Sequence, residues 1–65
     1  MHYNITDETG PTTIADTYQA AQQQVIHRWG GRAKDLDWDE SDPQVTRINL
    51  AGREVATIEY ADAIG

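Results

Sequence analysis

The feature that most constrains the fold is a set of apolar residues with helical spacing between positions 14 and 29. Its members are Ile14, Tyr18, Ala21, Val25 and Trp29, at spacings of 4, 3, 4 and 4 residues. At about 100° per residue they form one apolar stripe, which a helix buries against another layer. Thr12 or Thr13, followed by Asp16, resembles a capping box, and Gly30 suits a helix end. The pattern predicts one amphipathic helix that begins after Thr12 or Thr13 and ends at Gly30.

Three other segments have the two-residue alternation of β-strands. In residues 1–6, the side chains of Met1, Tyr3 and Ile5 share one face. Residues 44–50 and 54–60 are separated by a short segment in which Gly52 can adopt a positive φ, so they predict a hairpin. The residues expected on its inward face are Thr46, Ile48, Leu50, Ala56, Ile58 and Tyr60. Val55 is expected to point the other way.

These elements predict an α+β fold with the order β-α-β-β. One helix would pack on one face of a small three-stranded sheet, within a single domain that spans residues 1–65. The strand order is open, and an antiparallel sheet is preferred because small exposed sheets are usually antiparallel. Residues 32–43 show no useful periodicity and are expected to form a long acidic loop. The last residues, 62–65, are expected to form a short tail.

The expected loop contains the most unusual composition of the chain. Residues 35–42 hold five of the eleven acidic residues, and the remaining chain has six acidic and five basic residues. A solvated loop that maintains solubility is one interpretation. The other is a recognition surface that binds a protein partner with a basic surface, because clustered carboxylates steer association. The candidate contact residues are Asp35, Asp37, Trp38, Asp39, Glu40 and Asp42. Trp38 would be either the desolvated anchor of that contact or a core residue beneath the loop.

The overall composition excludes several classes of function. The net charge of −6 opposes direct binding to nucleic acid and to anionic membranes. With no cysteine, the chain has neither disulfides nor thiolate metal ligands. No apolar run is long enough for a membrane span, and the start lacks a signal-peptide pattern. We therefore expect a soluble, cytoplasmic protein with no membrane partner.

Neither a metal site nor a catalytic site is predicted. Asp35, Asp37 and Asp39 match positions 1, 3 and 5 of an EF-hand loop, but Glu40 stands where glycine is needed and Thr46 where glutamate is needed. No cofactor motif is present. Ser41 is the only serine and lies among acids, and the two histidines have no catalytic partner in sequence. We expect no enzyme activity.

The basic residues that follow the helix offer a further candidate surface. They are Arg28, Arg32 and Lys34. They would form either a small basic patch or local ion pairs with the acidic residues that follow.

In overall type the chain resembles the small acidic proteins of phages and mobile elements, including anti-CRISPR inhibitors and DNA mimics. This resemblance implies an inhibitor or interaction module that occupies a basic, nucleic-acid-binding surface of a partner. One alternative is a structural or assembly subunit, or a homo-oligomer, that uses the uncovered sheet face. That face would present Val45, Arg47, Asn49, Val55, Thr57 and Glu59. A weak divalent-cation-binding module is a further alternative.

Overall fold

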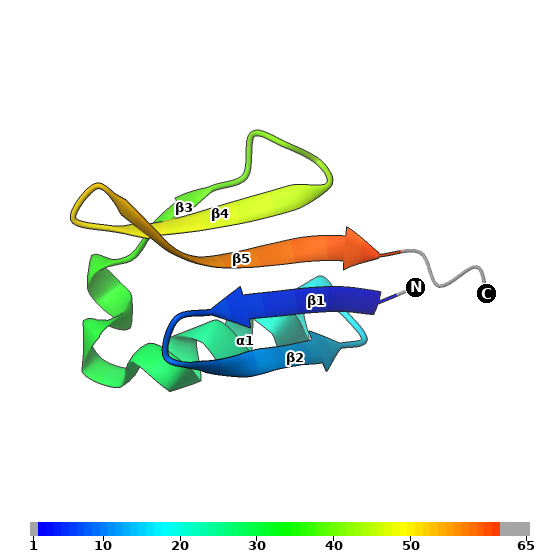
Figure 1. The fold of residues 1–65 in the computed structure, drawn as a ribbon, viewed down its shortest axis with the longest axis horizontal. Helices are drawn as coiled ribbons and strands as arrows, with labels where there is room; N and C mark the ends of the chain where they lie inside the picture. Colours follow the sequence, from blue (N-terminus) through cyan, green and yellow to red (C-terminus); the bar gives the residue numbers. More distant parts are fainter. Residues whose placement is uncertain (1, 62–65) are drawn as a thin grey trace.

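The computed structural model describes residues 2–61, which form one sheet and one long helix (Figure 1). The elements are β1 (His2–Asp7), β2 (Gly10–Ala15), α1 (Tyr18–Trp29), the 3-10 helix η1 (Gly30–Asp35), β3 (Asp37–Asp39), β4 (Val45–Leu50) and β5 (Arg53–Ala61). Met1, predicted on the inward face of the first strand, and the tail 62–65 lie outside the described residues.

The sheet has five strands in the order β2-β1-β5-β4-β3, and every pairing is antiparallel. The predicted three-stranded sheet and the β-α-β-β order are therefore wrong, although the broad α+β class holds. Two strands were missed. The predicted helix takes in only the last residues of β2, and β3 lies inside the segment 32–43, for which a loop is predicted. The preferred antiparallel pairing of the first strand with the last is confirmed.

The helix begins later than predicted. Thr17 is its N-cap, and the Thr17 side chain accepts a hydrogen bond from the backbone N–H of Ala20 at 3.0 Å. Ile14 belongs to β2, where it pairs with Asn4 and is 61% exposed. The β-branched residues before Ala15 form a hairpin with β1 instead of a first helical turn, because an extended partner strand is available to them.

The end of the helix is at the predicted position. Gly30 has a φ of 56° and its N–H donates to the carbonyl oxygen of Ile26, so it closes the last turn in a conformation that suits glycine. The chain continues through η1 to β3, the strand at the far edge of the sheet from β2. Helix α1 and η1 thus connect the two edge strands and leave the other sheet face, called here the open face, without a covering helix (Figure 1).

The core lies between α1 and the sheet. The fully buried side chains of the helix are those of Ala21 and Val25. The fully buried side chains of the three central strands are those of Ile5, Ile48 and Ile58. The predicted inward positions of Thr46 and Ala56 are also buried. These residues come from neighbouring strands in register, because Ile58 pairs with both Ile5 and Thr46.

Val55 departs from the predicted alternation. It is only 4% exposed and belongs to the core cluster, although it was expected to point to the opposite face. The β4–β5 register explains this difference. Ile48 pairs with Ala56 and Asn49 pairs with Glu54, so Val55 is the extra residue of a β-bulge. A bulge breaks the strict alternation of a strand and turns neighbouring side chains toward one side.

Candidate functional site

The acidic run, residues 35–42, does not form one surface, because β3 divides it. Trp38 pairs with Ile48 and therefore faces the helix side of the sheet. Its neighbours Asp37 and Asp39 are exposed and point to the open face, since side chains alternate along a strand. Asp35 is exposed at the end of η1.

Trp38 is partly buried and packs against the hydrophobic core. Of its two predicted roles, this placement matches that of a core residue beneath the acidic segment. Most of the anchoring area expected from an exposed tryptophan is thus directed inward, and a partner has to find its apolar contacts elsewhere on the surface.

The two remaining acids, Glu40 and Asp42, lie on the helix side. The Tyr18 hydroxyl donates a hydrogen bond to the Glu40 carboxylate, which connects the start of α1 to the segment after β3. Asp42 is partly buried, and its Oδ1 accepts the backbone N–H of Gln44 at 2.8 Å. The structure therefore brings Glu40 and Asp42 together and separates them from Asp37 and Asp39.

Local hydrogen bonds give the segment between these acids a defined shape. Asp39 Oδ1 accepts the backbone N–H of Ser41 at 3.1 Å and its hydroxyl at 2.7 Å. These bonds, followed by the more distant charge of Arg47, hold the pKa of the Asp39 carboxyl below its usual value. The end of the segment is fixed by the Tyr60 N–H, which donates to the Gln44 carbonyl at 2.8 Å. The acidic segment is therefore held by the fold.

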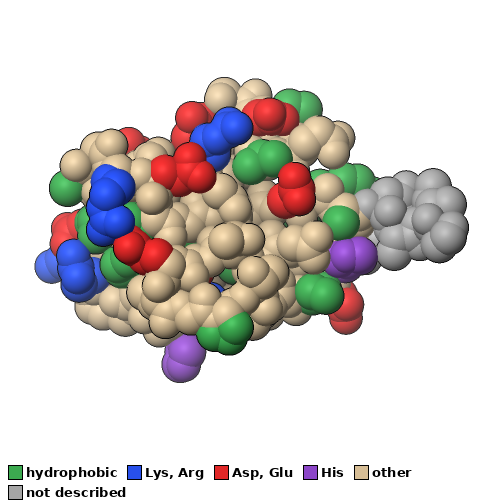
Figure 2. Space-filling model, viewed as in Figure 1, with side chains coloured by type: hydrophobic (Ala, Val, Ile, Leu, Met, Phe, Trp, Pro, Cys, Tyr) green, Lys and Arg blue, Asp and Glu red, His purple; other side chains and the backbone are tan. Residues whose placement is uncertain are grey.

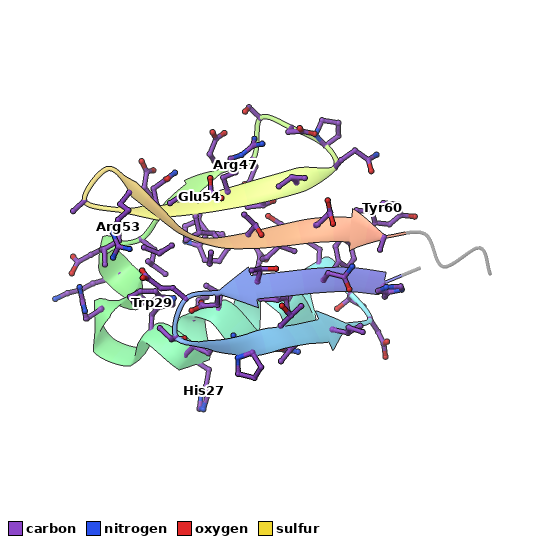
Figure 3. All side chains as sticks on the ribbon, viewed as in Figure 1. His27, Trp29, Arg47, Arg53, Glu54 and Tyr60 are labelled. Carbon is purple, nitrogen blue, oxygen red and sulfur yellow. The ribbon has the colours of Figure 1, made fainter. Side chains whose placement is uncertain are left out.

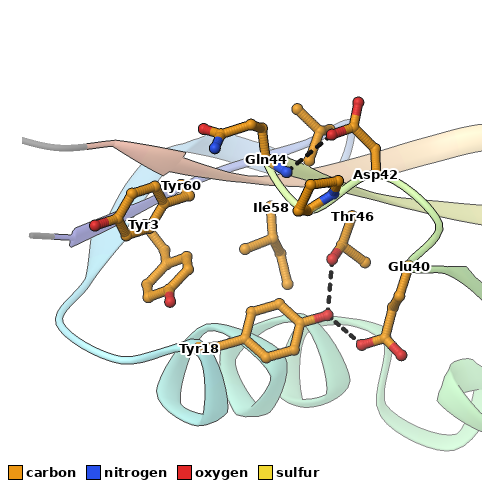
Figure 4. Close-up of a pocket in the computed structure, with 10 residues that line it drawn as sticks. Tyr3, Tyr18, Glu40, Asp42, Gln44, Thr46, Ile58 and Tyr60 are labelled. Carbon is orange, nitrogen blue, oxygen red and sulfur yellow. Dashed lines mark hydrogen bonds between the residues drawn. The ribbon is translucent and has the colours of Figure 1, made fainter.

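Next to Glu40 and Asp42 lies a pocket of about 300 Å³, called here the tyrosine pocket (Figure 4). Its ten lining residues are Tyr3, Tyr18, Glu40, Asp42, Pro43, Gln44, Val45, Thr46, Ile58 and Tyr60. They come from β1, α1, β4, β5 and the segment between β3 and β4. All three tyrosines of the chain are among them. Within residues 2–61, three aromatic and two acidic side chains meet at this pocket.

The tyrosine rings form a contiguous group. The ring centroid of Tyr3 lies 5.7 Å from that of Tyr18 and 5.4 Å from that of Tyr60, and both pairs are tilted or edge-on. Such arrangements are favourable for aromatic pairs. The pocket wall is therefore a preformed aromatic surface.

The Tyr18 hydroxyl is the polar centre of the pocket wall. It lies 2.7 Å from the Thr46 hydroxyl in addition to its bond with Glu40. Since the Tyr18 proton is used toward the carboxylate, the Thr46 hydroxyl donates to the Tyr18 oxygen. Burial, and then the hydrogen bond to Glu40, raise the pKa of Tyr18 above its usual value. At neutral pH this group is a hydrogen-bond donor and not a phenolate base.

Other polar groups are used within the fold. Arg28 Nη2 donates to the Pro11 carbonyl at 3.0 Å and to the Thr13 hydroxyl at 3.3 Å. The Arg32 guanidinium carbon lies 5.6 Å from the ring centroid of Trp29, as in a cation–π contact. Within residues 2–61 neither arginine forms an ion pair with the acidic run, so the predicted local pairing is wrong for both. Lys34 is exposed.

His27 is not part of the tyrosine pocket. His27 is exposed and projects from the lower edge of the molecule in Figure 3. Among residues 2–61, no group of three His, Asp or Glu side chains lies close enough together to hold a metal ion. No described helix is long and apolar enough to cross a membrane.

The tyrosine pocket was not predicted. One usable signal was that Tyr3, Tyr18 and Tyr60 each occupied an inward position of a predicted element, although a tyrosine hydroxyl needs a polar partner when it is buried. Three such residues in a chain of 65 indicate that water or a ligand can reach their hydroxyl groups at the edge of the core. The strand β3 also had a signal, because Leu36 and Trp38 alternate with aspartates.

No protein-family model, curated protein or solved structure matches this chain.

Proposed function

We propose that this protein is a small acidic interaction module that occupies a basic surface of a partner protein. The observation that carries the proposal is the tyrosine pocket, with Glu40 and Asp42 beside its aromatic wall (Figure 4). This combination supplies both contributions that a specific protein contact needs. The aromatic rings offer apolar area, and the carboxylates orient a cationic group.

The position of the pocket also supports a contact site. Tyr3, Tyr18 and Tyr60 are each partly buried, so their rings are fixed by the fold yet remain accessible at one side. Fixed aromatic side chains lose little conformational freedom on binding, and for this reason tyrosine is effective at interfaces. The contact surface proposed here is thus centred on the pocket.

The other acids of the run have a different role in this proposal. Asp35, Asp37 and Asp39 are exposed and lie outside the pocket. With a net charge of −6, the chain attracts a basic surface over distances of about a Debye length, roughly 8 Å at physiological salt. These acids raise the association rate, whereas Glu40 and Asp42 make the lasting contacts.

The open face gives less support to the alternative of an assembly subunit. The polar residues on this face, opposite α1, include Asn4, Thr6, Arg47, Thr57 and Glu59, and the apolar residues Ile14 and Val45 lie among them. Figure 2 shows acidic side chains with a basic one among them, mostly over its β4 and β5 half. Obligate homo-oligomer interfaces are more apolar than this. The composition favours a solvent-exposed face.

The experiment is a capture assay with matched charge variants. The native protein and two double variants are immobilised, and host-type lysate is passed over each. In one variant Glu40→Gln and Asp42→Asn remove two charges at the pocket. In the control, Asp37→Asn and Glu59→Gln remove two charges from exposed positions on the open face. Both variants have the same net charge, so differences in capture report on position.

We expect a partner that the native protein and the control capture and that the pocket variant loses. The captured partner should have a basic surface and should be released by raised salt. Release by duplex DNA would assign that surface to nucleic-acid binding. Equal capture by both variants, with both folded by circular dichroism, would contradict the proposal.

A further inference from the structure

We infer that the tyrosine pocket binds the guanidinium group of an arginine side chain. The inference rests on the proposed function and specifies the chemistry by which the partner is recognised. Three features of the described residues lead to it: the charge of the lining, the unused carboxylate oxygens, and the aromatic wall.

The lining is acidic and has no cation of its own. Glu40 and Asp42 contribute two carboxylates, and none of the ten lining residues is basic. The arginines of α1 and η1 do not line the pocket. Arg28 contacts β2, and Arg32 lies over the ring of Trp29. The pocket therefore presents negative charge that no described side chain of this protein neutralises by an ion pair.

Each carboxylate has one oxygen that forms no hydrogen bond within residues 2–61. Glu40 uses Oε2 for the Tyr18 hydroxyl, and Asp42 uses Oδ1 for the Gln44 N–H. Within residues 2–61, Glu40 Oε1 and Asp42 Oδ2 have no hydrogen-bond donor. The bonds that are already made fix the orientation of both groups. Guanidinium has five N–H donors in a planar fork and can bind a carboxylate through two parallel hydrogen bonds.

The aromatic wall selects a planar cation. The rings of Tyr3 and Tyr60 meet edge-on at 62°, and both residues line the pocket. A guanidinium group stacks on such rings and is weakly hydrated, whereas the ammonium group of lysine is a compact, strongly hydrated charge. A volume of about 300 Å³ is sufficient for one side chain and not for a folded segment. Arginine is the residue that satisfies all three features.

The test is an NMR titration of the whole protein with N-acetyl-arginine methylamide, read on the tyrosine ring resonances. We expect saturable shifts at Tyr3, Tyr18 and Tyr60 with a dissociation constant on the order of 1 mM. The corresponding lysine derivative should bind at least about threefold more weakly. Asp42→Asn should weaken arginine binding about fivefold or more, and Asp37→Asn should change it by less than about twofold.

Glu40→Gln is the second pocket variant, because glutamine keeps an acceptor for the Tyr18 hydroxyl. It allows the test to proceed if Asp42→Asn disturbs the fold. Shifts that do not saturate, equal binding of the lysine derivative, or equal losses in the pocket variants and Asp37→Asn would each overturn the inference.

The two proposals fail in different ways. If the arginine derivative does not occupy the pocket but the pocket variant still loses its partner in the capture assay, the arginine inference is wrong and the proposed function stands. If the derivative binds in the pocket but partner capture does not depend on Glu40 and Asp42, the proposed function is wrong and the pocket remains an arginine site.

Discussion

The indole Nε1 of Trp29 donates a hydrogen bond to Oδ2 of Asp7 at 2.8 Å, which joins the end of α1 to the end of β1. Asp7 is only 4% exposed, and its other oxygen accepts the N–H of Thr9 at 2.7 Å and the Thr9 hydroxyl at 2.6 Å. A buried carboxylate is tolerated when its lone pairs are used in this way. The pair Trp29–Asp7 therefore fixes the helix against the β1–β2 turn.

Replacement of Asp7 by asparagine is expected to destabilise the protein. The amide can offer one acceptor oxygen, so its NH₂ group faces either the Trp29 N–H or the Thr9 donors. We expect the free energy of unfolding to fall by about 1–3 kcal/mol, measured by urea denaturation. Asp16→Asn, at an exposed position, is the matched control and should change it by less than about 0.5 kcal/mol. Equal effects of the two changes would contradict a structural role for Asp7.

Tyr18→Phe removes the hydroxyl that connects α1, Glu40 and Thr46. Thr46 is 6% exposed and would lose this partner, so the free energy of unfolding should fall by about 0.5–1.5 kcal/mol. Amide hydrogen exchange in residues 40–44 should become faster, since the segment would lose its contact with the helix. Tyr60→Phe, which changes the same group elsewhere in the pocket, is the control. Unchanged exchange in 40–44 would show that Tyr18 does not hold this segment.

Stability should also decline at alkaline pH because of Tyr18. Its pKa is raised above the model-compound value of 10.0, mainly by burial and then by the bond to Glu40. Above pH 10 the unfolded chain releases this proton while the folded protein retains it, so the folded state is favoured less as pH rises through that range. Thermal unfolding from pH 9 upward should show a smaller alkaline loss in Tyr18→Phe than in the native protein. The same loss in both proteins would rule out Tyr18 as its source.

The parts of the fold that were predicted correctly depend on local patterns. The helix end needs only Gly30, whose positive φ is available to glycine wherever the helix sits. The inward positions of Ile48, Ile58 and Ile5 follow from the two-residue period of a strand, which holds whichever strand is the neighbour. Such features can be read from a few adjacent residues.

The errors occurred where pairing partners decide the structure. Ile14 fits a helical stripe by spacing, but in the folded chain β1 provides an extended partner and residues 10–15 pair with it. β3 consists of two aspartates around Trp38, residues of low combined strand propensity, and it forms because β4 lies beside it. Tertiary context overrode local propensity in both cases.

The candidate site was only partly foreseeable for the same reason. The charge of Glu40 and Asp42 was visible in the sequence, but the separation of these two acids from Asp37 and Asp39 depends on β3. Likewise, the pocket needs Tyr3 and Tyr60 from paired strands, a contact that sequence spacing does not reveal.

The corrected start of the helix gives a direct test of the architecture. The Thr17 side chain caps the helix by accepting the Ala20 N–H, whereas Thr12 lies exposed on the edge strand β2. Thr17→Ala should therefore lower the free energy of unfolding by about 1 kcal/mol. Thr12→Ala should change it by less than about 0.5 kcal/mol, because an exposed edge position has few contacts to lose. Urea denaturation of both variants measures the difference. If Thr12→Ala proved the more damaging change, the helix would begin near residue 13, and β2, with the five-stranded sheet, would be wrong.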